Sequence, residues 1–379
     1  MRTLFSLLLF LAPALACLAQ HTATVNISFE LHAPNLPDSA QVYITGNAPQ
    51  LGDWSPNKVK MERNGPNKWQ KQITVQSTAH LEYKYTLGSW QREATDSTGR
   101  PLPNFSAEAT TNQVRQDQVS YWRNGETIPV KGGITGSVIY HRSVGNGQNL
   151  PARDLIVWLP PGYEQHTKRR YPVLYMHDGQ NIFDPVTSSF GLDWRIDETA
   201  DSLIRAGAME PVIIVGIYNN ADRMQEYIPG DKGNAYMDFV MNTVKPLIDK
   251  TYRTKPESKY TATGGSSAGG TISFMLAWEH PEVFSKAICM SPAFKIQKID
   301  YVDDVLSYKG PRKKLYLYID NGGIELEAQL QPGIDEMLQA LRNKCQDYVF
   351  VKDPNAKHSE TAWAKRTPRA LKLVFPVKK

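Results

Sequence analysis

From residue 154 onward, short apolar runs alternate with helical patterns, and this alternation limits the fold more than any other feature of the sequence. The strand-like runs lie at residues 154–159, 171–176, 212–217 and 314–319. Helical patterns, such as those at residues 235–250 and 270–279, lie between them. Strands that are apolar along their whole length and are connected by helices form a largely parallel sheet covered on both faces. The sequence therefore predicts an α/β domain over residues 136–379.

The first third of the chain has a different pattern, without a helical period of useful length. Short runs that alternate between apolar and polar residues lie at residues 24–29, 41–44, 69–75 and 81–85. Clusters of Gly, Pro and Asn separate these runs, as is typical of a β-sandwich. We therefore expect a small all-β sandwich domain at residues 21–123 and a polar, Gly-containing linker at residues 124–135.

Residues 1–20 have the pattern of a signal peptide. Arg2 provides the positive start, residues 4–11 are almost entirely apolar, and small residues follow. The apolar stretch is too short for a permanent membrane anchor, so we expect a secreted or periplasmic protein. The cleavage position stays open between the bond after Ala19 and a lipoprotein-type site, which would leave a lipid anchor on Cys17.

Composition excludes several classes of partner. The net charge is +5 over 379 residues and no long run of Lys or Arg occurs, so we expect no nucleic-acid partner. No later segment reaches about 18 unbroken apolar residues, so we expect no integral membrane domain. Cys289 and Cys345 have no neighbours at metal-ligand spacing. A disulfide between these two cysteines stays open.

The motif Gly265-Ser266-Ser267-Ala268-Gly269 carries the strongest chemical signal. A strand-like run precedes it at residues 260–263 and a helical run follows it from residue 270, which is the context of a nucleophile elbow. Glycine has no Cβ, so the chain can turn sharply on both sides of the serine. We therefore predict that Ser267 is a catalytic nucleophile, and the alternative is a Gly/Ser-rich turn without chemistry.

A nucleophilic serine needs a general base, which follows it in the chain in this type of fold. Only His280 and His358 follow Ser267. His280 closes the helix that starts at the nucleophile and therefore lies about 18–20 Å away, at about 1.5 Å per residue. His358 follows a strand-like run and a polar loop, so we predict that His358 is the base.

The acid of the triad must hold the imidazole in its correct tautomer. Candidates on the loop after the strand at 314–319 are Asp320, Glu325 and Glu327, with Asp353 as a weaker fourth, and position alone does not choose among them. For the oxyanion hole we predict the N–H of Ala268, which follows the nucleophile, and the N–H of Gln180, in the loop after residues 173–176.

His177 and Asp178 stand next to each other at the end of the strand at 171–176. Successive side chains at a strand end point in opposite directions, so we interpret this pair as structural rather than catalytic.

Residues 133–379 resemble the esterase D-like family of hydrolases, which includes feruloyl and acetyl xylan esterases of carbohydrate esterase family one, siderophore trilactone esterases and mycolyltransferases. The matching segments are residues 159–163, 171–181, 265–270, 280–284, 291–294 and 358–360 with Trp363. The resemblance implies an α/β-hydrolase fold and no metal or organic cofactor. It places the acid at the end of a Gly-x-x-Asp/Glu pattern, hence at Glu325, with Asp320 as the alternative, and it supports Gln180 as an oxyanion donor.

Residues 42–47, 50–54 and 81–85 resemble the starch-binding domains of carbohydrate-binding module families 20 and 48. The resemblance implies a sugar platform made of Trp54, Lys84 and Trp90, because flat aromatic rings cover the apolar faces of sugars. A sandwich that only positions the hydrolase domain is the alternative.

These observations predict a secreted serine carboxylesterase that forms an acyl-enzyme on Ser267, with His358 and Glu325 as partners. A sugar-binding domain would hold such an enzyme on its polymer, so we expect it to remove feruloyl or acetyl groups from polysaccharide. The alternatives are a ferric-siderophore trilactone esterase and a non-catalytic glycan-binding surface protein.

Overall fold

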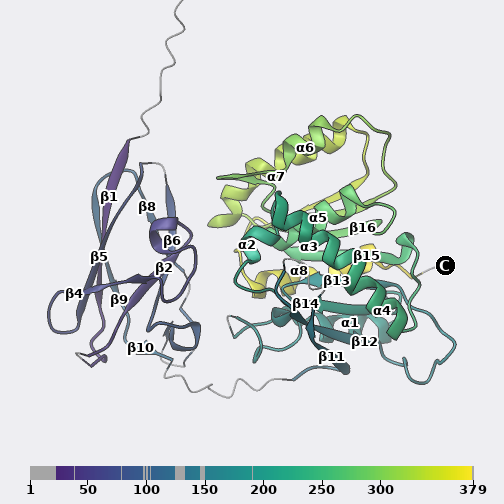
Figure 1. The fold of residues 1–379 in the computed structure, drawn as a ribbon, viewed down its shortest axis with the longest axis horizontal. Coiled ribbons are helices and arrows are strands. Elements are labelled where there is room, and N and C mark those ends of the chain that lie inside the picture. The colour runs from purple at the N-terminus through teal and green to yellow at the C-terminus, as the bar shows by residue number, and fades with distance from the viewer. Residues whose placement is uncertain are drawn as a thin grey trace, which may run out of the picture. The chain divides into compact units, whose positions relative to one another are not determined.

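The structure, a computed structural model, describes residues 23–37, 39–77, 79–96, 99, 101–102, 104–123, 133–145, 150–189 and 191–377. The chain divides into two compact units at the boundary between residues 128 and 129 (Figure 1), and each is described by itself. The expected signal peptide with Cys17 and most of the expected linker lie outside the described residues. No helix among the described residues is long and apolar enough to cross a membrane.

The N-terminal unit consists of β-strands and two short 3₁₀ turns in its described part. Their bounds are β1 (Thr24–His32), β2 (Tyr43–Gly46), η1 (Pro49–Leu51), β3 (Val59–Lys60), β4 (Glu62–Arg63), β5 (Lys68–Gln76), β6 (His80–Thr86), η2 (Trp90–Arg92), β7 (Ala94–Thr95), β8 (Phe105–Glu108), β9 (Gln113–Gln118) and β10 (Tyr121–Trp122). One sheet has the order β4-β5-β1-β9 and another the order β3-β2-β6-β8, while β10 pairs with β7. Phe29 of β1 contacts Tyr83 of β6 across the two sheets, with ring centroids 4.6 Å apart. The predicted sandwich is therefore present.

The C-terminal unit is built on one large sheet, with the order β11-β12-β14-β13-β15-β16-β19-β20 over the described residues. Its strands are β11 (Ser137–Val144), β12 (Arg153–Leu159), β13 (Val173–His177), β14 (Ile213–Ile217), β15 (Thr261–Ser266), β16 (Lys286–Met290), β19 (Tyr316–Asn321) and β20 (Tyr348–Lys352); a small hairpin adds β17 (Lys295–Ile296) and β18 (Ile299–Asp300). All pairings from β14 to β20 are parallel, whereas β12 pairs antiparallel with both of its neighbours, β11 and β14.

Helices cover both faces of this sheet (Figure 1). They are α1 (Ile196–Arg205), α2 (Arg223–Glu226), α3 (Asp231–Phe239), α4 (Lys245–Thr251), α5 (Ala268–Glu279), α6 (Val302–Ser307), α7 (Leu326–Asn343) and α8 (Glu360–Val374), with the short turns η3 (Gly179–Asn181), η4 (Val240–Val244) and η5 (Ser258–Tyr260). Alternate residues of β13 show why helices must cover both faces of the sheet. Tyr175 lies in the core formed with α3, α5 and α7, while Leu174 and Met176 lie in the core formed with α1 and α8. The predicted α/β-hydrolase-like fold is confirmed.

The parallel strands bring the functional candidates to one edge. Because parallel strands end at the same edge of a sheet, the residues that follow β13, β15, β16, β19 and β20 meet there. Gln180 follows β13, Ser267 follows β15, Ser291 follows β16, Glu327 follows β19, and His358 follows β20.

Candidate active site

Ser267 occupies the sharp turn between β15 and α5. Its backbone has φ 56° and ψ −129°, a conformation that residues with a Cβ rarely adopt. The Ser267 N–H donates to the carbonyl oxygen of Met290 at 2.9 Å, which fixes the turn on the neighbouring strand. A Cβ on Gly265 would lie 2.7 Å from the backbone carbonyl of Gly269. The glycines of the motif are therefore required by close packing of the strand against the helix, as a nucleophile elbow demands.

The two predicted oxyanion donors lie on either side of this elbow. Ala268 is the first residue of α5, where backbone N–H groups have no partner within the helix. Gln180 lies in η3, and its side chain donates to Asn219 Oδ1 at 2.6 Å, which holds the loop in place. A Cβ on Gly269 would meet the carboxylate of Asp178 at 3.2 Å, so the η3 loop packs directly on the start of α5.

His358 lies in the loop between β20 and α8. Its Nδ1 is 3.5 Å from Oε2 of Glu327, and its ring packs edge-to-face on Trp363 with centroids 4.9 Å apart. The His358 side chain is 15% exposed, whereas the Glu327 carboxylate is completely buried. The imidazole of His358 therefore lies edge-to-face against an indole ring, with one nitrogen beside a buried carboxylate.

Glu327 also interacts with Ser291 and Arg366. Its Oε1 accepts a hydrogen bond from the Ser291 hydroxyl at 2.6 Å and lies 3.5 Å from Nη2 of Arg366. Burial acts to raise the pKa of Glu327, but its interaction with His358, the hydrogen bond from Ser291 and the charge of Arg366 hold that pKa below its usual value. The carboxylate beside His358 is therefore ionised at neutral pH.

Glu325, which the resemblance implied as the acid, is not beside His358. Its side chain is 50% exposed and forms an ion pair with Lys357, with Oε1 and Nζ 2.5 Å apart. Residue 325 immediately precedes α7, and side chains two positions apart on a helix turn point to different sides. Glu327 consequently faces the sheet edge, and the geometry replaces Glu325 with Glu327 as the acid candidate.

The alternative acid, Asp320, is buried at the end of β19. Its Oδ1 lies 3.6 Å from Nη1 of Arg366, and its other oxygen accepts from the Tyr318 hydroxyl at 3.1 Å. Burial raises the pKa of Asp320 to about 7, despite the opposing charge of Arg366. Asp320 thus lies behind Glu327 and Arg366 in one polar network, with no recorded contact to His358 among the described residues.

His177 and Asp178 bind different partners. The His177 ring lies between the Tyr236 hydroxyl at 2.8 Å and the Thr263 hydroxyl at 3.1 Å, and burial lowers its pKa to about 3. Asp178 instead accepts two hydrogen bonds from Arg223, at 2.6 and 2.7 Å. The neutral His177 therefore fixes the strand end, while the ion pair fixes the loop that carries Gln180.

Glu360, the first residue of α8, is a buried carboxylate two residues after His358. Burial raises the pKa of Glu360 to about 7, and the charges of His358, Asp178 and Arg223 act on it as well.

Ser291 and Arg366 are site residues that the sequence did not single out. The Ser291 hydroxyl accepts from Arg366 Nη2 at 2.8 Å and from the Trp363 indole N–H at 3.1 Å, while it donates to Glu327. The position of Ser291 directly after the apolar run that forms β16 is the feature of the sequence that could have indicated it. Arg366 lies in α8, where nothing in the sequence distinguishes it from a surface arginine.

The residues of the expected sugar platform do not share one environment. Trp54 and Trp90 are partly exposed, whereas Lys84 is 8% exposed. The Lys84 ammonium donates to Glu93 at 3.3 Å and to the carbonyl oxygen of Leu102 at 2.7 Å. This burial removes Lys84 from the platform and makes it part of the sandwich interior.

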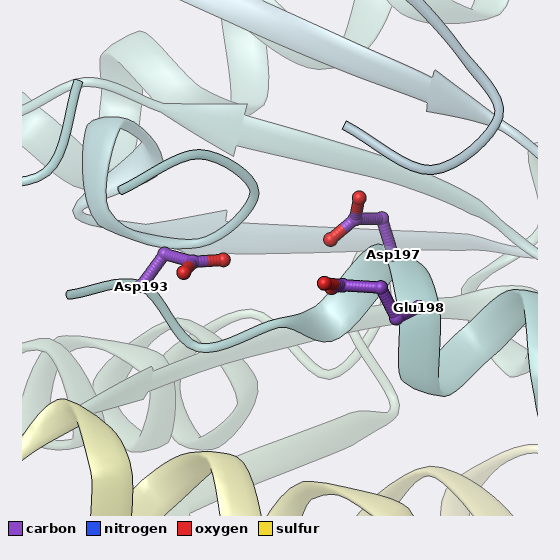
Figure 2. Close-up of side chains that lie close together, drawn as sticks. All are labelled: Asp193, Asp197 and Glu198. Atoms are coloured by element: carbon purple, nitrogen blue, oxygen red, sulfur yellow. The ribbon is translucent and has the colours of Figure 1, made fainter. Parts of the chain in front are cut away.

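Neither cysteine is bridged, with Cys289 buried in β16 and Cys345 exposed. In the described part of the chain, one group of three acidic side chains has metal-ligand spacing: Asp193, Asp197 and Glu198 (Figure 2).

The match of the chain to known families covers both units. Residues 152–373 match the family described as "Putative esterase", and residues 24–119 match the family described as "Starch binding domain". The uncharacterised protein YjcH of Bacillus subtilis is 28% identical over 236 residues, which are 58% of this chain and 90% of that protein. The endo-1,4-beta-xylanase/feruloyl esterase of Xylanibacter ruminicola is 25% identical over 241 residues, which are 58% of this chain and only 30% of that protein.

Solved structures share the fold at lower identity. A ferulic acid esterase has a TM-score of 0.55 and 22% identity, and the match covers 65% of this chain and 99% of that chain. The enterobactin esterase FES of Shigella flexneri, solved with enterobactin, has a TM-score of 0.54 and 12% identity, with 93% of each chain covered.

Proposed function

Because the chain belongs to the esterase family that its residues 152–373 match, and carries a starch-binding module at residues 24–119, we propose that it is a serine carboxylesterase whose triad is Ser267, His358 and Glu327. The observation that carries the proposal is the pairing of His358 with a buried, ionised carboxylate at the sheet edge where the Ser267 elbow ends.

The proposed reaction proceeds through an acyl-enzyme. His358 takes the proton of the Ser267 hydroxyl as the serine oxygen attacks the ester carbonyl, and Glu327 stabilises the imidazolium that forms. The N–H groups of Ala268 and Gln180 donate to the oxyanion of the tetrahedral intermediate. The imidazolium then protonates the leaving alcohol, and a water molecule, deprotonated by the same histidine, releases the acid from Ser267.

For the substrate we propose a feruloyl or acetyl ester of a polysaccharide. The starch-binding match supports a polymeric substrate, because a bound module keeps the enzyme at a high local concentration of ester. The relative that is an endo-1,4-beta-xylanase/feruloyl esterase supports the acyl group. In the sugar-binding unit we retain Trp54 and Trp90, whose partly exposed rings can cover a sugar face.

A ferric-siderophore lactone is the second candidate, because the likeness to the enterobactin esterase extends over both units. The charges at the site favour the polysaccharide ester. Arg223 is already paired with Asp178, and Arg366 with Glu327 and Asp320, so these cations offer little net positive charge to a polyanionic complex.

The test compares purified wild type with Ser267→Ala, using Ser266→Ala as the matched control, on 4-nitrophenyl acetate, methyl ferulate, feruloylated arabinoxylan and an enterobactin-type lactone. We expect Ser267→Ala to lose at least about 10³-fold in kcat and Ser266→Ala to retain most activity. Unchanged turnover in Ser267→Ala would refute the nucleophile, whereas a wild type without turnover above background would favour a glycan-binding protein without catalysis. Faster hydrolysis of the lactone than of both ferulates would refute the proposed substrate and leave the proposed nucleophile in place.

A further inference from the structure

A cluster of three carboxylates lies beside the proposed site without taking part in it. Asp193 precedes α1, while Asp197 and Glu198 lie in the first turn of that helix. One ligand oxygen from each side chain lies within 4.8 Å of the others. Figure 2 shows the carboxylate of Asp193 turned toward those of Asp197 and Glu198.

Among the described residues, each carboxylate accepts from a protein donor through one of its two oxygens. The Arg195 N–H donates to Asp193 Oδ2 at 3.0 Å, the Thr135 N–H donates to Asp197 Oδ2 at 2.6 Å, and Arg195 Nε donates to Glu198 Oε1 at 3.1 Å. These donors fix the orientation of all three groups and leave a second oxygen of each available.

The two second oxygens on α1 are buried without a donor. Asp197 is completely buried, and its Oδ1 has no hydrogen-bond partner among the described residues; the same holds for the buried Oε2 of Glu198. A buried acceptor without a donor costs about 1–3 kcal/mol, and more when it is charged. Carboxylates this close also repel one another. A bound cation would remove both costs, and the side chain of Arg195 is 67% exposed and contacts only the outer oxygen of Glu198.

We propose that Asp193, Asp197 and Glu198 form a binding site for a calcium ion. Three carboxylate oxygens are ligands that hard divalent cations prefer. Two oxygens on opposite sides of Ca²⁺ lie about 4.6–5.2 Å apart, and across Mg²⁺ about 4.0–4.2 Å. Three oxygens within 4.8 Å of one another can reach one Ca²⁺ at about 2.3–2.6 Å, and the flexible coordination of Ca²⁺ tolerates irregular separations that the strict octahedron of Mg²⁺ does not. Backbone carbonyls and water would complete its coordination.

The site would act on the proposed active site through Trp194. The Trp194 N–H donates to the carbonyl oxygen of Asn181 at 3.0 Å, in the η3 turn that also contains Gln180. The Trp194 ring contacts Trp363 with centroids 5.6 Å apart, and Trp363 packs on His358. Calcium would thus hold the segment that supports both the oxyanion loop and the base, which gives it a positioning role.

The buried Trp194 also supplies a direct readout, because an excited indole sensitises Tb³⁺ bound close to it. We would titrate EDTA-treated full-length protein with TbCl₃ and displace the ion with CaCl₂, and measure Tm in Ca²⁺ and in EDTA. The variants are Asp197→Asn, Glu198→Gln and the control Asp201→Asn, which removes a carboxylate one turn further along α1 that pairs with Arg205.

We expect sensitised emission that Ca²⁺ reverses, and a Tm rise of about 5–10 °C at Ca²⁺ about 100-fold above its Kd. Both effects should persist in Asp201→Asn and disappear in Asp197→Asn. If Asp197→Asn does not fold, the loss of both effects in Glu198→Gln tests the same expectation. Wild type without displaceable emission or a Tm shift would overturn the proposal and indicate that Asp197 and Glu198 share a proton instead. Emission that survives in both cluster variants would also overturn it, because the ion would then bind elsewhere.

Discussion

Replacement of Glu327 by Gln keeps the size of the side chain and removes the negative charge beside His358. In the wild type Glu327 is completely buried and its pKa is held below the usual value, so the charge is present throughout the neutral range. Ser291 and Arg366 can still contact the amide of the variant. The substitution should therefore affect the imidazolium that forms during catalysis more than the fold.

The magnitude follows from the 3.5 Å separation between His358 Nδ1 and Glu327 Oε2. Opposite unit charges at that distance attract by about 5 kcal/mol in an effective dielectric of about 20. One factor of ten in rate corresponds to about 1.4 kcal/mol. Loss of this attraction in the transition state gives an expected decrease of about 10³-fold in kcat, with little change in KM.

The assay is steady-state hydrolysis of 4-nitrophenyl acetate and methyl ferulate, with circular dichroism and Tm to verify folding. Glu325→Gln is the matched control, because it makes the same chemical change two residues away. Its exposed pair with Lys357 is worth at most about 1 kcal/mol, so kcat should stay within about twofold of wild type. The assignment of the acid is refuted if Glu325→Gln loses the activity and folded Glu327→Gln retains it.

Three further substitutions test the elbow, the buried network and the sandwich. Gly265→Ala should destabilise the hydrolase domain by about 1–3 kcal/mol in denaturant unfolding and should lower kcat, because its Cβ would lie 2.7 Å from the Gly269 carbonyl; wild-type stability would contradict this. The folded state keeps the Asp320 proton up to about pH 7, whereas the unfolded chain releases it near pH 4, so stability should fall as the pH rises from about 4 to about 7. Asp320→Asn should flatten this slope, and an unchanged slope would show that Asp320 does not cause it. Lys84→Met should lower the free energy of unfolding of the sandwich by about 3 kcal/mol or more, because the buried Glu93 loses a partner. The double variant Lys84→Met/Glu93→Gln should recover much of that stability, whereas a single variant as stable as wild type would return Lys84 to the sugar-binding candidates.

The fold could be predicted from the sequence because each signal was local. The apolar run that forms β13 is buried on both faces, and its alternate residues enter two cores, which is the environment that continuous apolar strands require. The alternation in β1 likewise reflects one face on the sandwich core, with Ile27 and Phe29 buried. One predicted helix shows a local irregularity: Pro246 near the start of α4 removes a backbone donor, and the preceding turn η4 widens to a π-helix.

The environments of Lys84 and Glu327 could not be predicted, because both depend on where a side chain points. Lys84 lies on a strand in which nearly every residue is buried, so the usual alternation of buried and exposed positions does not apply. Its partner Glu93 comes nine residues later, beyond a 3₁₀ turn, and nothing in the sequence links the two before the chain folds. Ser291 and Arg366 likewise meet Glu327 only because β16, α7 and α8 converge at one sheet edge.

The comparison of Ser267 with Glu325 shows why a motif can locate a turn without identifying its functional side chain. Both residues precede a helix directly, and their backbones are nearly identical, with φ 56° and ψ −129° at Ser267 and φ 61° and ψ −128° at Glu325. At Ser267 the turn carries the residue that the motif itself predicts as the nucleophile. At Glu325 the same turn directs the longer side chain to Lys357 at the surface, and the following helix turns Glu327 inward to His358. A Gly-x-x-Glu pattern therefore fixes where α7 begins, and the helical period from that point, rather than the pattern itself, determines which carboxylate lies beside His358.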